Sequence, residues 1–174
     1  MSNETLKTIS DRRSNRSYKP EQITKDELDA LLKAAVEAPS ARNAQPWFFS
    51  VVQDVALLDE INEDIAMNTQ KEKRDVFYGA PTVIFISGDD TNRWAALDSG
   101  IAVENIALAA TSLGLGSVIL GYPDHSLLGP KKDYFAKKLK FPEGTSFTIA
   151  IAVGYAKDTK AAHEVKGEKI AYVK

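Results

Sequence analysis

The chain has 174 residues, which is enough for one domain with its own hydrophobic core. Its 44% hydrophobic and 26% charged residues are typical of a globular protein, and a net charge of −2 gives no support to nucleic-acid binding. The absence of cysteine excludes disulfides, zinc fingers, iron–sulfur clusters and thiol nucleophiles. No secretory signal and no apolar stretch of ~20 residues is visible, so we predict a cytoplasmic protein without a membrane helix.

Helices and strands alternate along the chain. Thr24 and Glu27 form a capping box before an apolar face with three- and four-residue spacing, which predicts a helix. The apolar run 81–86 predicts a strand that is covered on both faces. In chain order we predict a short helix ending near residue 12, an extended segment at 15–18, a helix at 25–37, a strand at 47–52, a helix around 57–65, a strand at 81–86, a helix at 94–113, a strand at 116–120, a loop at 122–129, a short helix within 131–140 and a strand at 145–153. The sum is a single α+β domain, with a mixed sheet flanked by helices.

Two segments lack the periodicity of a core. Residues 68–75 are polar and highly charged, and predict a mobile crossing on the surface. Residues 156–174 are rich in lysine and contain little apolar material before 170–173. We predict that this tail is either frayed or lies as an extra strand on a neighbouring sheet, such as that of a partner subunit.

The first candidate site is the sequence Arg12-Arg13-Ser14-Asn15-Arg16. Arginine carries a planar fork of donors that suits phosphate oxygens, and serine adds a hydroxyl. Because residues two apart share a side of an extended segment, Ser14 and Arg16 can meet one anion together. The alternative interpretation is a solvated basic patch.

The second candidate is the loop from Pro39 to Pro46. Asn43 and Gln45 each carry an amide with donors and an acceptor, which can read the edge of a heterocycle. The flanking prolines stiffen the loop and reduce the ordering cost of binding. The alternative is an ordinary connection in which Ser40 and Asn43 satisfy local backbone groups.

The third candidate, Gly114 to Gly121, is not a dinucleotide-binding fingerprint. The glycine spacing differs from G-x-G-x-x-G, and the segment follows a predicted helix and enters a strand, the reverse of the required order. We predict instead that Gly114 caps the helix and that the backbone bends at Gly121, where a flat ligand can approach.

Other catalytic arrangements are missing from the sequence. It contains no G-x-S-x-G, H-E-x-x-H or Walker pattern, and His125 and His163 are its only histidines. Asp98, Glu104 and Asn105 lie on the predicted long helix, but they do not pair two carboxylates for acid–base work. This scarcity of side-chain chemistry indicates that a cofactor carries out the reaction.

These segments, in this order, resemble the nitroreductase family of FMN-dependent oxidoreductases. The residues that carry the resemblance span most of the chain: Arg12-Arg13-Ser14-Asn15-Arg16, Ala38-Pro39-Ser40-Ala41-Arg42-Asn43-Ala44-Gln45-Pro46-Trp47, Gly79-Ala80-Pro81, Leu113-Gly114-Leu115-Gly116 and Val153-Gly154-Tyr155. The resemblance implies the nitroreductase fold, with a mostly antiparallel central sheet and a C-terminal tail that lies on the partner subunit. It further implies a homodimer with FMN at the subunit interface.

The resemblance also implies roles for single residues. The phosphate and ribityl end of FMN would contact Arg12, Arg13, Ser14 and Arg16. The ring would be lined, from the other subunit, by Pro39, Ser40, Asn43 and Gln45. The strand along the flavin would consist of Val118, Ile119, Leu120 and Gly121. The backbone N–H of Leu120 or Gly121 would lie near N5. No side chain would be catalytic. The segment 67–78, with Asn68, would supply further contacts on the substrate side. Of the tail residues Lys157, Lys160 and Lys166, the last fits the phosphate site best.

The reaction that this family implies is a ping-pong transfer. NADH or NADPH gives a hydride to FMN, and a nitroaromatic, a quinone or a similar small acceptor then takes the electrons. Three alternatives stay open from the sequence: a flavin- or nucleotide-binding module without catalysis, an interaction protein whose alanine-rich helix serves only dimerisation, and a specialised branch that removes halogen, fragments flavin or takes electrons from a protein donor. The chain is compact for this family, so a particular substrate is not carried over.

Overall fold

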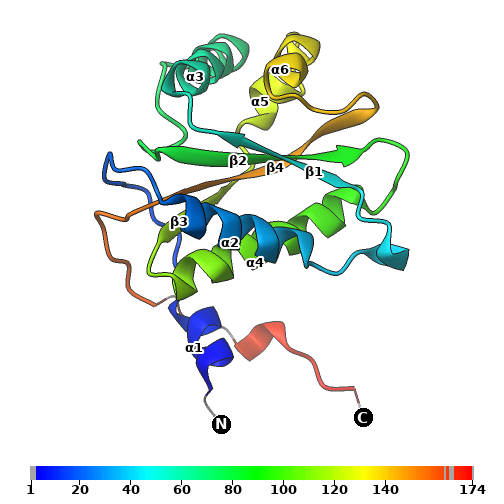
Figure 1. The fold of residues 1–174 in the computed structure, drawn as a ribbon. Helices are drawn as coiled ribbons and strands as arrows, with labels where there is room; N and C mark the ends of the chain where they lie inside the picture. The colour runs from blue at the N-terminus through cyan, green and yellow to red at the C-terminus, as the bar shows by residue number, and fades with distance from the viewer. Residues whose placement is uncertain (1–2, 163, 165–166, 174) are drawn as a thin grey trace.

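The computed structural model describes residues 3–162, 164 and 167–173. A four-stranded sheet forms its middle layer (Figure 1). The strands are β1 (Trp47–Val52), β2 (Thr82–Asp89), β3 (Gly116–Leu120) and β4 (Thr145–Gly154), in the spatial order β1-β2-β4-β3. All neighbouring strands are antiparallel, and a parallel bridge joins Ser14 to Ser117 at the edge of β3. This confirms the mixed, mostly antiparallel sheet of the sequence prediction.

Helices cover both faces of this sheet. In Figure 1, α2 and α4 lie on one face, and α3, α5 and α6 lie on the other. The short α1 lies beside the C-terminal half of α4, away from the sheet. The bounds are α1 (Glu4–Asp11), α2 (Lys25–Val36), the 3-10 turn η1 (Ala41–Asn43), α3 (Val55–Thr69), α4 (Ala95–Ser112), α5 (Asp124–Leu127), α6 (Lys132–Lys138) and the 3-10 turn η2 (Gly167–Lys169).

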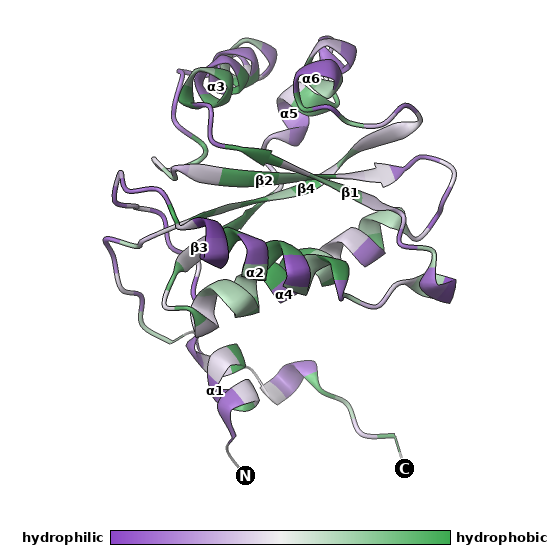
Figure 2. Cartoon of the chain, in the orientation of Figure 1, coloured by the Kyte–Doolittle hydropathy of each residue, from purple (hydrophilic) through white to green (hydrophobic). Residues whose placement is uncertain are grey.

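The two faces of the sheet carry separate hydrophobic cores. On the α3 side, Phe85 of β2 packs between Phe77 and Phe147, with ring centroids 5.8 and 6.4 Å away. On the α4 side, Ile84 and Ile86 of the same strand pack with residues of α2 and α4. Because successive side chains of a strand point to opposite faces, the four residues 83–86 of β2 must all be apolar to serve both cores. Figure 2 shows the resulting contrast between apolar β2, β4 and α4 and the polar outer faces of α2 and α3.

The capping box predicted for α2 is present. The Thr24 hydroxyl accepts from the backbone N–H of Glu27, and the Glu27 carboxylate accepts from the backbone N–H of Thr24 at 2.7 Å. These hydrogen bonds hold the pKa of Glu27 below its usual range. The Tyr155 hydroxyl also donates to Glu27, at 2.8 Å, so the start of α2 is tied to the end of β4.

Two sequence predictions on the α3 side are wrong in part. The predicted loop 122–129 contains the helix α5, which forms because the Ser126 hydroxyl donates to buried Asp64 and Leu127 is buried in the core. The predicted surface crossing at 68–75 begins too early, since Asn68 and Thr69 still belong to α3. The spacing of apolar residues reveals neither α5 nor the last residues of α3, because residues far away in the sequence stabilise both.

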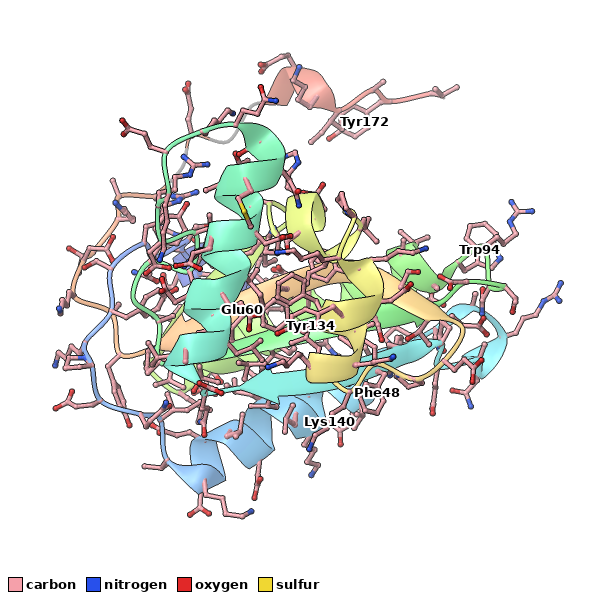
Figure 3. All side chains as sticks on the ribbon, turned by 90° about the horizontal axis from the view of Figure 1, so that it is seen from above. Phe48, Glu60, Trp94, Tyr134, Lys140 and Tyr172 are labelled. Carbon is pink, nitrogen blue, oxygen red and sulfur yellow. The ribbon has the colours of Figure 1, made fainter. Side chains whose placement is uncertain are left out.

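Among the described residues, the first part of the tail, at 156–161, contacts the body of the domain. Ala156 forms an antiparallel bridge with Tyr18, and the side-chain amide of Asn15 donates to Asp158. Farther along, Tyr172 is 83% exposed and projects from the edge of the molecule (Figure 3). The sequence prediction that the tail lies on a partner's sheet stays a prediction.

The aromatic cluster on the α3 side generates a stability prediction. Replacing fully buried Phe85 by alanine should lower the free energy of unfolding by about 3–5 kcal/mol, because it removes two ring contacts and leaves a cavity. Replacing exposed Val55 at the start of α3 by alanine should change it by less than about 0.5 kcal/mol. Urea unfolding of the two variants measures the difference, and equal effects would contradict this assignment of the core.

Candidate functional site

The N-terminal segment is fixed along the outer edge of β3. Ser14 bridges Ser117, and the backbone N–H of Asn15 donates to the Ser117 carbonyl at 2.9 Å. Asn15 is buried, and a Cβ at Gly116 would lie only 3.1 Å from its side chain and 2.7 Å from the Cβ of Ala156. Glycine at position 116 therefore lets the segment approach β3, and the approach brings Arg16 to the edge of the sheet.

The same edge of β3 presents backbone donors and acceptors. In an antiparallel strand, the N–H and C=O of one residue point to the same side, and successive residues alternate. The Ser117 carbonyl faces the N-terminal segment and not β4. It follows that the polar backbone groups of Ile119 and the N–H of Gly121 face the same outer edge, while the polar backbone groups of Leu120 face β4. The Gly121 carbonyl accepts from the backbone N–H of Asp124 at 3.0 Å.

A groove of about 220 Å³ lies along this edge. It brings together Arg16 and the four residues 118–121 that were predicted from the sequence. Its lining consists of Arg16, Arg74, Asp75, Val76, Tyr78, Val118, Ile119, Leu120, Gly121 and Tyr122. The Arg16 guanidinium lies 5.9 Å from the centre of the Tyr78 ring, and that of Arg74 lies 4.7 Å from the Tyr122 ring. Two arginine–tyrosine pairs at cation–π distance thus bring positive charge and aromatic rings to the groove.

The structure places Arg12 and Arg13 differently from Arg16. Arg12 ends α1 and its Nε lies 3.4 Å from a carboxylate oxygen of Glu104 on α4. The Arg13 guanidinium donates to the backbone carbonyls of Ser10 and Ala161, at 2.6 and 3.0 Å. Arg13 therefore ties α1 to the tail, while Arg16 is the arginine of this motif that lines the groove.

The loop from Pro39 to Gln45 lies elsewhere. Its local contacts match the connecting role considered from the sequence: the Ser40 hydroxyl accepts from the backbone N–H of Gln45, and the Gln45 amide donates to Asn43. The loop is attached to α4 by Asp98, near the N-terminus of that helix. The groove lies near the opposite end, because β3 begins shortly after α4 ends (Figure 1).

The length of α4 sets the separation between the two sets of residues. Asp98 and Ser112 are fourteen residues apart in one helix, which at 1.5 Å per residue is about 21 Å. Within one chain, the groove is not lined by Pro39, Ser40, Asn43 or Gln45. Their predicted role requires that they come from a second copy.

Two further predicted residues are not placed in the groove. The side-chain amide of Asn68 donates to Asp64 and to the carbonyl of His125, both at 2.9 Å, and so links α3 to α5. Lys166 lies outside the described residues. Of the other tail lysines weighed for the phosphate site, Lys160 pairs with Asp158 at 3.2 Å. Contacts of these residues with a cofactor stay predictions.

Sequence reasoning did not single out Arg74, Tyr78 and Tyr122. Asp75 shapes the turn that positions the first two, because its carboxylate accepts from the backbone N–H groups of Phe77 and Gly79 at 2.9 and 2.6 Å. The turn includes left-handed backbone at Tyr78 and Gly79, with φ of 59° and 71°. The prediction of ligand contacts from the segment 67–78 pointed to this region, but no motif within it identified the arginine.

Other kinds of site find no support in the described residues. They contain no cluster of histidine, aspartate and glutamate that could hold a metal ion. None of the helices described is both long enough and apolar enough to cross a membrane.

Comparisons with known proteins agree with this arrangement. The family model described as "Nitroreductase family" matches residues 9–155. A relative from Archaeoglobus fulgidus, described as a proposed NADH dehydrogenase/NAD(P)H nitroreductase, is 35% identical over 92% of this chain and 90% of its own.

Solved structures extend the likeness to the whole fold. A nitroreductase with bound FMN from Desulfitobacterium hafniense is 36% identical and has a TM-score of 0.92, with all of both chains covered. Another with bound FMN, from Bacteroides fragilis, is 32% identical and has a TM-score of 0.91, covering 99% of this chain and 100% of its own.

The contact between Asp158 and the N-terminal segment generates a prediction about pH. Burial opposes the charged form of Asp158, but hydrogen bonds from Asn15, Lys160 and the Arg16 backbone outweigh it and lower the pKa. A lowered folded-state pKa gives stability that is present above the unfolded pKa and is lost as the pH falls through the folded value. The Asp158→Asn variant should therefore be less stable than the wild type at pH 7, and the difference should shrink in acid below the usual aspartate range. Urea unfolding from pH 7 to pH 3 measures this, and a constant difference would contradict it.

Proposed function

The chain belongs to the nitroreductase family, and from this premise we propose that it is an FMN-dependent oxidoreductase that uses NAD(P)H to reduce nitroaromatics, quinones or similar small acceptors. The observation that carries the proposal is the groove, in which the Arg16 guanidinium and the free backbone edge of β3 lie together. Positive charge suits the phosphate and the electron-rich edge of a flavin, and backbone groups suit the polar rim of its ring.

The residues present fit such a group. A Cβ built at Gly121 would meet nothing within 4 Å, so the backbone is open on that side. The outer edge offers the polar backbone groups of Ile119 and the N–H of Gly121, and the guanidinium groups of Arg16 and Arg74 lie at the groove over tyrosine rings. Bound FMN would supply the chemistry, which is to accept a hydride and pass two electrons on.

The protein's own contribution is to bind and orient. We propose that the backbone N–H of Gly121 is the donor directed at the flavin N5, since the Leu120 N–H faces β4. The arginines hold the anionic parts of the cofactor and favour negative charge on its ring. Their contacts with the tyrosine rings keep both guanidinium groups in place before binding, which reduces the entropy that the arginine side chains lose when the cofactor binds.

We also propose that the working form is a homodimer with two such sites. Two features support it: the second set of predicted ligands lies at the far end of α4, and α4 has an outward row of apolar residues at helical spacing. Leu97 of this row is 58% exposed, and Ile101 and Leu108 are half-buried. A two-fold copy packed on α4 covers this row and brings the Pro39–Gln45 loop of each chain to the groove of the other.

The purified protein should bind FMN and turn over. It should be yellow after incubation with FMN and gel filtration, and NADH or NADPH should bleach it without oxygen.

Arg16→Ala should weaken FMN binding about 10- to 100-fold, because a charge-assisted hydrogen bond of about 1.5–3 kcal/mol is lost. Lys132→Ala, which removes an exposed positive charge from α6, is the matched control and should bind as the wild type does. A colourless protein, or equal affinity in both variants, would sink the proposal.

Mixed dimers test the two-chain site. Arg16→Ala and Asn43→Gly should each bind FMN weakly, and glycine at 43 suits the left-handed backbone there, with φ of 55°. When equal amounts are unfolded and refolded together, half of the dimers are mixed and each mixed dimer has one intact site. About a quarter of wild-type FMN binding should return. No recovery on mixing, or a monomer in sedimentation with FMN bound, would contradict the shared site.

A further inference from the structure

The loop that carries the second set of predicted ligands has an unfavourable backbone conformation. Arg42, Asn43 and Gln45 all have left-handed backbones, with φ of 57°, 55° and 47°. Residues with a Cβ are uncommon in this region, and each costs free energy that other contacts must offset. Three of them within four positions mean that the loop has to be held in place from outside.

Asp98 provides such a contact. It lies in the first turn of α4, and only 2% of its surface is exposed. Both carboxylate oxygens lie 3.2 Å from the backbone nitrogen of Ala41, which donates to them at the start of η1. This hydrogen bond anchors the loop, because Ala41 directly follows Ser40 and directly precedes the left-handed residues.

Within the described part of the chain, the buried carboxylate of Asp98 has few hydrogen-bond partners. Burying a carboxylate is costly unless it is well paired, and the Ala41 N–H is its one hydrogen-bond partner among the residues that the structure describes. The N-terminal end of α4 favours a negative charge there. Both carboxylate oxygens lie within hydrogen-bond distance of the Ala41 N–H, and this buried acceptor is what would hold the strained loop in a single conformation.

We infer that Asp98 is a positioning residue of the cofactor site, which acts by fixing the Ser40–Gln45 loop that reaches the partner's groove. The inference rests on the proposed function. It assigns Asp98 a role at the site of the other subunit, although its own chain's groove lies at the opposite end of α4. The competing explanation is that Asp98 only stabilises its own domain.

Three variants separate these explanations. Asp98→Ala removes the acceptor, and Ala41→Pro removes the donor while the carboxylate stays. Proline is tolerated at the first position of a helical turn, and Ser40 before it is already extended, with ψ of 154°. Both variants should weaken FMN binding about 10- to 100-fold. Asp98→Asn retains an oxygen that can accept from Ala41, and it should bind within about threefold of the wild type.

The decisive measurement uses mixed dimers and FMN fluorescence quenching, with no turnover. Asp98→Ala refolded with Arg16→Ala should recover about a quarter of wild-type binding, because each defect then falls on a different site of the mixed dimer. Asp98→Ala refolded with Asn43→Gly should recover nothing, because both defects lie in the same loop. Ala41→Pro should behave as Asp98→Ala does in both mixtures, which guards against a variant that folds poorly.

The possible failures differ from one another. If Asp98→Ala recovers with neither partner while the Arg16→Ala and Asn43→Gly mixture does recover, Asp98 acts through general stability and the inference is wrong. Unchanged FMN affinity in both Asp98→Ala and Ala41→Pro also overturns it and leaves the proposed function intact. A wild-type protein that binds no FMN overturns the proposed function, and the inference with it.

Discussion

The site depends on how closely the N-terminal segment approaches the edge of β3. The Ser14–Ser117 bridge, buried Asn15 and the missing side chain at Gly116 form one contact, and each part requires the others. An edge strand normally leaves a row of unpaired backbone groups. Here the first part of the edge is covered by residues 14 and 15, and the rest, at Ile119 and Gly121, stays open beside Arg16. The same contact therefore covers the first part of the β3 edge and leaves the last part free for a ligand.

The long helix α4 gives the fold its second constraint. Its buried face carries one of the two cores, its first turn holds the Pro39–Gln45 loop through Asp98, and its last turn leads directly into β3. One rigid element thus lies between two groups of predicted ligands, and the loop residues do not line the groove of their own chain. A rotation of a second copy about a two-fold axis on α4 is the simplest way to bring them together. In such an arrangement, dimerisation completes the chemistry as well as covering apolar surface.

The sequence predicted the fold and some of the residues that line the groove, and the division has a physical basis. Three features could be predicted because their pattern is local: the capping box of Thr24, the apolar run of β2, and Arg16 with residues 118–121. Arg74 and Tyr122 were missed, because their pairing joins two turns and neither turn shows periodicity. Asp98 was noted and set aside as one carboxylate without a partner, since its partner is a backbone N–H far away in the sequence. The helix α5 was read as a loop because Asp64, on another helix, stabilises it.

The sequence offers few side chains suited to catalysis, and the geometry of the groove explains why few are needed. A site that binds through backbone groups and guanidinium charge needs no nucleophile and no paired acid and base. Backbone donors are insensitive to substitution as long as the strand keeps its register, which β3 keeps by pairing with β4 through residues 116–120. Tyr78 and Tyr122 are less replaceable, because each lies against an arginine of the groove. Under the proposed function, the backbone edge of β3 and the two arginine–tyrosine pairs would therefore hold the cofactor together.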